Sequence, residues 1–173
     1  RIDYETMGDE RAPAIVLIMG LGMQSIAWPG PFCAALVREG FRVIRFDNRD
    51  SGLSSRMSGG GTANLMMALA AKWLRLPVPA PYSLDDMAAD TVGLMDALGI
   101  ARAHVVGASM GGMIAQLVAI RHPARVASLT SIMSSTGNAS LSKPTAAARR
   151  ALLRPAPGPA DVDAVVEHLV SLF

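Results

Sequence analysis

The chain has 173 residues, enough for one domain with a substantial core, and 51% of them are hydrophobic. Its net charge is +2 and its basic residues are scattered, Arg149-Arg150 being the only adjacent pair, so we expect no nucleic-acid partner. Unbroken apolar runs such as Ala14 to Met19 are far shorter than the ~20 residues of a membrane span, so no span is expected.

Cys33 is the only cysteine, which excludes an internal disulfide, and its apolar neighbours indicate a buried helix face. A single buried cysteine fits a reducing compartment, so we expect a cytoplasmic protein. We expect it to bind neither a metal nor a cofactor. No signal peptide is visible, but the chain does not begin with Met. Because Arg1 to Glu5 already alternate as in a strand, we expect the natural start to lie upstream.

Two β-like segments open the chain, Ile2 to Met7 and Ala14 to Met19. The second lacks alternation between apolar and polar residues and is flanked by Pro13 and Gly20. This pattern is typical of a strand buried on both faces, as in a parallel sheet. A glycine-rich bend, Gly20-Leu21-Gly22, follows the second strand.

The next segment predicts a helix with Pro29 in its first turn and Gly40 as its C-cap. Its apolar face would consist of Phe32, Cys33, Leu36 and Val37. Residues Phe41 to Phe46 then predict a strand that ends in Asp47-Asn48-Arg49-Asp50-Ser51-Gly52. The stretch from about Met57 to Pro81 holds three glycines and three prolines, which indicates an excursion from the core.

The following residues predict two further strands and two helices. Ser83, with Asp86 three residues on, is a helix N-cap, and apolar residues then recur at helical spacing until Gly99. The segment His104-Val105-Val106 is a short strand, and the segment Met110 to Arg121 is a helix stopped by Pro123. The last convincing strand is Val126 to Met133.

Strands that alternate with helices in this order predict an α/β fold, with a mostly parallel sheet covered by helices on both faces. We expect residues 1–136 to form the N-terminal part of this core. After Ser134 the composition shifts to Ala, Pro, Arg and Ser, and Val162 to Phe173 begins an amphipathic helix. We therefore expect residues 137–173 to start a cap or lid, and the C-terminal part of the core to lie beyond Phe173.

The segment Gly107-Ala108-Ser109-Met110-Gly111 stands between a predicted strand and a predicted helix. A Gly-x-Ser-x-Gly string in this context is typical of a nucleophile elbow, a sharp turn that raises the serine hydroxyl above the sheet edge. Gly107 and Gly111 lack Cβ atoms and so leave room for the turn. Ser109 is therefore the candidate nucleophile. The alternative is that Ser109 only caps the helix beside a tight turn.

A serine nucleophile also needs donors for the oxyanion that forms on the substrate. The backbone N–H of Met110 is one candidate. The second should come from a loop after an earlier strand, which makes the N–H of Leu21 our first choice and that of Gly22 our second. The alternative for this segment is an ordinary glycine-rich loop between a strand and a helix.

These motifs, together with Asp47-x-Arg49-x-x-Gly52-x-Ser54, resemble the α/β-hydrolase superfamily in its esterase-like branch. The decapeptide from Val43 to Gly52 is especially similar to the aclacinomycin methylesterase group. Two positions depart from the common pattern, where many relatives have His-Gly for Met19-Gly20 and Arg-Gly-x-Gly for Arg49-Asp50-Ser51-Gly52. We expect Asp47, Arg49 and Asp50 to brace the loops around the site, the alternative being a catalytic role.

The three histidines are poor candidates for the base that must activate Ser109. His104 lies about 16 Å back along the strand at ~3.3 Å per residue, and His122 lies about 20 Å along the helix at 1.5 Å per residue. His168 belongs to the late helical segment. In this fold the order is Ser, then Asp or Glu, then His, so we expect the acid and the base beyond Phe173.

The pocket would lie under a cap from about Gly137 onward, with Thr62 to Pro81 as a second wall. Most of the methionines should pack in the core, but Met110 adjoins the nucleophile and should lie near the site. Trp28 and Trp73 are interpreted as packing residues. The sequence therefore predicts a serine hydrolase that acts on a small-molecule carboxylic ester through an acyl-enzyme on Ser109. Acyltransferases, carbon–carbon bond hydrolases, perhydrolases and a non-catalytic binding module or inactive fragment remain alternatives, and the substrate and the oligomeric state are not defined.

Overall fold

A computed structural model describes residues 1–57, 81–138, 140–141, 145–147, 150 and 166–167. Five strands in this part of the chain form one sheet in the order β1-β3-β2-β4-β5. They are β1 (Tyr4–Met7), β2 (Ala14–Ile18), β3 (Arg42–Phe46), β4 (Ala103–Ala108) and β5 (Val126–Ile132). Strands β2 to β5 run parallel to one another, and β1 pairs antiparallel with β3 at one edge. The predicted mostly parallel sheet is confirmed.

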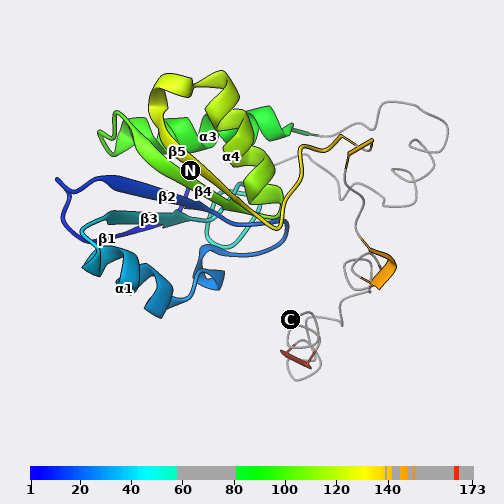
Figure 1. Ribbon diagram of the computed structural model, residues 1–173, viewed down its shortest axis with the longest axis horizontal. Coiled ribbons are helices and arrows are strands. Elements are labelled where there is room, and N and C mark those ends of the chain that lie inside the picture. The colour runs from blue at the N-terminus through cyan, green and yellow to red at the C-terminus, as the bar shows by residue number, and fades with distance from the viewer. Residues whose placement is uncertain (58–80, 139, 142–144, 148–149, 151–165, 168–173) are drawn as a thin grey trace. The chain divides into compact units, whose positions relative to one another are not determined.

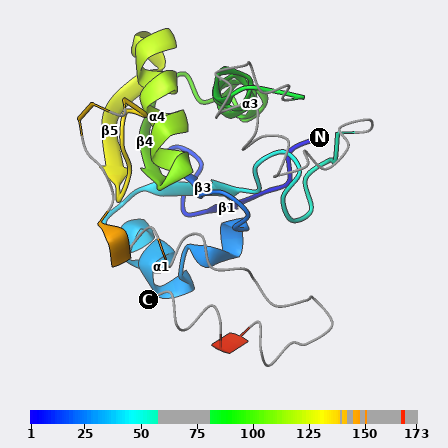
Figure 2. The ribbon, with the colours of Figure 1, turned by 90° about the vertical axis from the view of Figure 1, so that its right-hand side faces the viewer.

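Helices lie on both faces of this sheet, as predicted. Figure 1 shows α3 and α4 on one face and α1 on the other, and Figure 2 shows the same separation from the side. The helices are α1 (Gly30–Arg38), α3 (Leu84–Ala97) and α4 (Met110–Arg121), joined by the short 3₁₀ turns η1 (Ser25–Ala27) and η2 (Pro123–Arg125). The fold class predicted from the sequence is therefore correct.

Strand β2 is buried along its whole length because it separates two hydrophobic cores. Val16 and Ile18 point to the core under α3 and α4. Leu17 points to the opposite core, where it joins Trp28 and Cys33. A strand with apolar neighbours on both faces has no polar side to display, which explains why the sequence shows no alternation there.

The helix boundaries are close to those that local sequence signals predict. Helix α4 begins at Met110 and ends at Arg121, as predicted. At the start of α3, Ser83 accepts a hydrogen bond from the Asp86 N–H and the Asp86 carboxylate accepts one from the Ser83 N–H, which completes a capping box. The predicted apolar face of α1 is partly wrong, because Phe32 is exposed and stacks on Trp28 with ring centroids 5.7 Å apart.

The chain divides into two compact units, Arg1–Thr136 and Gly137–Phe173. The sheet and its helices belong to the first unit, and the cap at residues 137–173 stays a prediction. The expected excursion at Met57 to Pro81 and the expected helix at Val162 to Phe173 lie almost wholly outside the described residues. None of the helices that the structure describes is both long and apolar enough to cross a bilayer.

Candidate active site

Ser109 stands at the turn between β4 and α4. Its backbone angles, φ 54° and ψ −120°, fall in a region that non-glycine residues rarely adopt. The Ser109 N–H donates to the Ile132 carbonyl at 3.0 Å, so the turn is tied to β5. The Ser109 side chain makes no capping hydrogen bond to α4, and the residue is exposed. The hydroxyl is therefore exposed at the sheet edge and, within the described residues, does not serve as a helix cap.

The two glycines of the motif are required by close backbone contacts on either side of this turn. A Cβ at Gly107 would collide with the Gly111 carbonyl and would lie 2.6 Å from the Gly112 nitrogen. A Cβ at Gly111 would collide with the Ile18 carbonyl and would lie 2.8 Å from the Met19 oxygen. Because backbone atoms cannot move aside as side chains do, only glycine fits at either position.

The loop after β2 lies directly against the serine. A Cβ built on Gly20 would be 3.6 Å from the Ser109 Oγ. The Met23 N–H donates to the Gly20 carbonyl at 3.3 Å, and Gly22 at φ 71° occupies the third position of this β-turn. No acceptor among the described residues takes the N–H of Leu21 or of Met110. Within the described residues, both predicted oxyanion donors are thus without an acceptor.

Asn48 is a site residue that the sequence analysis did not single out. It is buried, and its Nδ2 donates to the Met19 carbonyl at 2.9 Å. This bond fixes the peptide that leads into the turn at Gly20. Its position directly after β3, a neighbour of β2 in a parallel pair, was the available signal, because carboxyl ends of parallel strands meet at one sheet edge.

Asp47 braces the loops, as expected. Its Oδ1 accepts the Ser25 N–H at 2.6 Å, and its Oδ2 accepts the Leu53 N–H at 2.9 Å. The Ser54 hydroxyl donates to the Asp47 carbonyl at 2.6 Å. At Gly52, where φ is 52°, a Cβ would collide with the Asp47 carboxylate. With both carboxylate oxygens occupied by backbone donors in a buried position, Asp47 has a structural role.

Arg49 and Asp50 connect this loop to α3 and to the segment that precedes it. The Arg49 guanidinium forms a two-bond ion pair with Asp90, at 2.6 and 2.8 Å, which raises the pKa of Arg49. The Asp50 carboxylate accepts the Met57 N–H at 2.6 Å and hydrogen-bonds the Tyr82 hydroxyl, and the two bonds lower the Asp50 pKa. Burial, followed by the bond to Asp50, raises the pKa of Tyr82.

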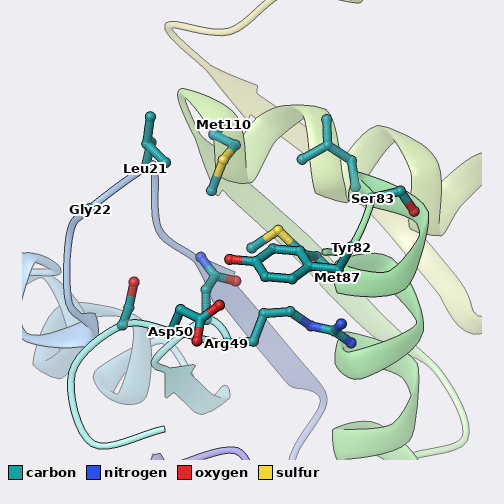
Figure 3. Close-up of a pocket in the computed structure, with 11 residues that line it drawn as sticks. Leu21, Gly22, Arg49, Asp50, Tyr82, Ser83, Met87 and Met110 are labelled. Atoms are coloured by element: carbon teal, nitrogen blue, oxygen red, sulfur yellow. The ribbon is translucent and has the colours of Figure 1, made fainter. Parts of the chain in front are cut away.

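A pocket of about 280 Å³ opens beside the serine turn, between the loops after β2 and β3 and the start of α3 (Figure 3). Its lining residues are Leu21, Gly22, Asn48, Arg49, Asp50, Ser51, Tyr82, Ser83, Leu84, Met87 and Met110. Ser109 does not line the pocket itself, but both predicted oxyanion donors do. The prediction that Met110 lies near the site is correct, whereas Met87 was missed and Trp28 is a packing residue as expected.

Neither described histidine lies near the serine hydroxyl. His104 stands near the start of β4, where its Nδ1 is 2.8 Å from the Ser128 Oγ. His122 caps the far end of α4, and His168 lies outside the described residues. Within the described part of the chain, no group of three or more His, Cys, Asp or Glu side chains could hold a metal ion.

Comparison with known proteins fits this geometry. Residues 13–161 match the family model of the alpha/beta hydrolase fold. The chain belongs to the α/β-hydrolase family. It is 36% identical to the rhodomycin D methylesterase of Streptomyces peucetius over 126 residues, which cover 73% of this chain and 36% of that protein.

Two solved structures support the same assignment. The enol-lactonase of Burkholderia xenovorans is 35% identical with a TM-score of 0.57, and the match covers 72% of this chain and 40% of that one. A hydrolase of Pseudomonas aeruginosa is 26% identical with a TM-score of 0.65, and the match covers 99% of this chain and 62% of that one. The chain thus spans less than two thirds of the length of each of these α/β-hydrolases.

Proposed function

We propose that the protein is a carboxylic-ester hydrolase that forms an acyl-enzyme on Ser109. The observation that carries this proposal is the strained Ser109 turn, with the N–H groups of Leu21 and Met110 beside it, which no described acceptor takes. A nucleophile and two backbone donors at one sheet edge are the parts that acyl transfer needs. The rhodomycin D methylesterase is an ester hydrolase by name, which supports the same chemistry.

The proposed reaction has two steps. The Ser109 Oγ forms a bond to the ester carbonyl carbon, and the N–H groups of Leu21 and Met110 stabilise the resulting oxyanion. The carbonyl re-forms, the C–O bond to the alcohol breaks, and the alcohol leaves with the proton taken from Ser109. Water then attacks the acyl-enzyme in the same way, so that the carboxylic acid is released and the Ser109 hydroxyl is restored.

A base must carry the proton in both steps, and an acid must orient that base. His104 contacts Ser128 near the start of β4 and His122 stands at the far end of α4, so we propose that both partners lie outside these 173 residues. We also propose that residues 137–173 form the start of a cap. The proposal also includes a cytoplasmic location, which is supported by the buried and unpaired Cys33.

The test is active-site labelling of the full-length protein with a fluorophosphonate, followed by peptide mass spectrometry. We expect the label on Ser109, and we expect Ser109→Ala to lower p-nitrophenyl ester hydrolysis by at least about a thousandfold. Ser128→Ala is the matched control, because Ser128 is an exposed serine on β5 that contacts His104 and not the site.

The alternatives give different results in the same experiment. A wild-type full-length protein that takes no label would refute the proposal and favour a non-catalytic binding module. Label on Ser109 with acyl transfer to an added alcohol faster than to water would make the protein an acyltransferase, which uses the same elbow. Label on Ser109 with cleavage of carbon–carbon bonds and not of esters would favour a carbon–carbon bond hydrolase.

A further inference from the structure

The polar side of the pocket has two charged residues with opposite surroundings. Among the described residues that line the pocket, Arg49 is the only cation and Asp50 is the only anion. Three further charged groups lie nearby: Asp86 and Asp90 on α3 interact with Arg49, and Arg56 interacts with Asp50. What the pocket can bind therefore depends on how far each of the two charges is already neutralised.

The positive charge of Arg49 is compensated by an ion pair with Asp90. Its Nε and Nη2 donate to the two carboxylate oxygens of Asp90, and Nη2 also donates to the Asp86 carbonyl at 3.2 Å. The guanidinium carbon lies 5.0 Å from the centre of the Tyr82 ring. Figure 3 shows the side chain of Arg49 extending towards α3 and away from Leu21. A substrate carboxylate would therefore have to compete with Asp90, whose bidentate pair with Arg49 is already well formed.

The negative charge of Asp50 is not neutralised in this way. Its carboxylate accepts hydrogen bonds from the Met57 N–H and the Tyr82 hydroxyl, and both donors are uncharged. These bonds, aided more weakly by Arg49 and Arg56, lower the pKa of Asp50 and keep it ionised. No cation among the described residues lies within ion-pair distance of Asp50. Among the described residues, the charged groups in and beside the pocket are therefore Asp50, Asp86 and Asp90 against Arg49 and Arg56, which is an excess of negative charge at neutral pH.

We propose that the pocket beside Ser109 accepts uncharged or cationic parts of an ester and discriminates against parts that carry a carboxylate. This inference rests on the proposed function, because it assigns the charge preference of the same site. The other wall of the pocket consists of Leu21, Leu84, Met87 and Met110, which suits an apolar group. Asp50 then repels an anion on that group, while Arg49, held by Asp90, cannot compensate.

The test variant is Asp50→Asn, which removes the charge and retains the shape. The asparagine oxygen can still accept the Met57 N–H, and Asn tolerates the left-handed backbone at φ 63° as well as Asp does. Asp96→Asn is the matched control. Asp96 carries the same charge at the far end of α3, where it pairs with Arg125 and lies outside the pocket.

The experiment compares kcat/KM of the full-length protein for two pairs of esters. One pair differs in the acyl part, p-nitrophenyl butyrate against mono-p-nitrophenyl succinate, and the other differs in the alcohol part, phenyl acetate against 4-carboxyphenyl acetate. We expect Asp50→Asn to reduce the preference for the neutral ester about three- to tenfold in the pair whose charge enters the pocket. In the wild type this preference should weaken as salt is raised, because Asp50 is exposed. Asp96→Asn should leave both preferences unchanged.

A binding measurement separates failure of this inference from failure of the proposed function. By ligand-observed NMR, hexanamide should bind the wild type more tightly than hexanoate does, and Asp50→Asn should narrow the difference. If no ester is turned over but this binding difference is found, the proposed function fails and the charge preference stands. If Ser109 is labelled but Asp50→Asn alters neither the ester preferences nor the binding difference, the charge preference is refuted.

Discussion

Two glycines in helices of this fold should respond in opposite directions to the same substitution by alanine. Gly111 is the second residue of α4 and is buried, and Gly93 lies inside α3 and is exposed. At Gly93 an added Cβ meets no atom within 4 Å. At Gly111 the added Cβ collides with the Ile18 carbonyl of β2 and lies 2.8 Å from the Met19 oxygen.

The magnitudes follow from these surroundings. Alanine in a helix interior is favoured over glycine by about 0.8–1.0 kcal/mol, so Gly93→Ala should raise the free energy of unfolding by about that amount. Gly111 lies in the first turn of α4, where the gain in helix stability from alanine is smaller. The collision at Gly111 forces α4 away from β2, and overpacking of this kind costs about 1–3 kcal/mol or more. The two variants should therefore differ by at least about 2 kcal/mol.

Urea unfolding of the wild type and both variants, followed by circular dichroism, measures this difference. An added Gly112→Ala variant extends the test, since its Cβ would lie 2.5 Å from the Ser134 Cβ and should also be destabilising. Equal stability of Gly111→Ala and Gly93→Ala would refute the close packing of α4 on β2. A change in the urea dependence itself would indicate that the unfolded or native ensemble had changed instead.

Two further predictions concern the charged residues around the pocket. Arg49→Gln should lower the free energy of unfolding by about 1–3 kcal/mol, because it leaves the partly buried Asp90 unpaired. Arg121→Gln should lower it by about 0.5 kcal/mol or less, because the side chains of Arg121 and its partner Asp85 are 61% and 52% exposed. Equal losses of the two variants in urea unfolding would contradict this prediction. The pKa of Asp86 is lowered by its hydrogen bonds to Ser83, so this contribution to stability is present above the ordinary Asp pKa of 3.8 and lost as pH falls through the lower folded-state value. Ser83→Ala should therefore show a shallower loss of thermal midpoint between pH 5 and pH 2 than the wild type, and parallel curves would rule out this linkage.

The parts of the fold that were predictable are those with a local signal. The uniform burial of β2 follows from an apolar run, and the limits of α4 follow from the serine turn and Pro123. The strand order β1-β3-β2-β4-β5 and the antiparallel pairing of β1 could not be predicted from the sequence. Strand order depends on contacts between segments far apart in the chain, and a period of two or 3.6 residues does not record them.

The residues of the candidate site also differ in whether a local sequence signal marks them. Ser109, Leu21 and Met110 could be singled out because a turn motif and a glycine-rich loop mark them locally. Asn48 and Tyr82 were not singled out, because each acts through a partner at long range: Asn48, marked only by its position after β3, holds the Met19 carbonyl, and Tyr82 bonds Asp50. A buried amide or a half-buried phenol has no sequence pattern of its own until the fold supplies the second residue of the pair.

The backbone of Ser109 is itself an argument for function at this site. A non-glycine residue in such a region costs about 1–3 kcal/mol, and glycine could adopt the same angles without that cost. The neighbouring Gly107 and Gly111 show that the chain has glycine wherever the turn only requires space. Ser109 combines this strain with exposure, and there the chain has a hydroxyl that makes no capping bond to α4. A residue that served stability alone would be glycine there, so the serine is best explained by the chemistry of its side chain.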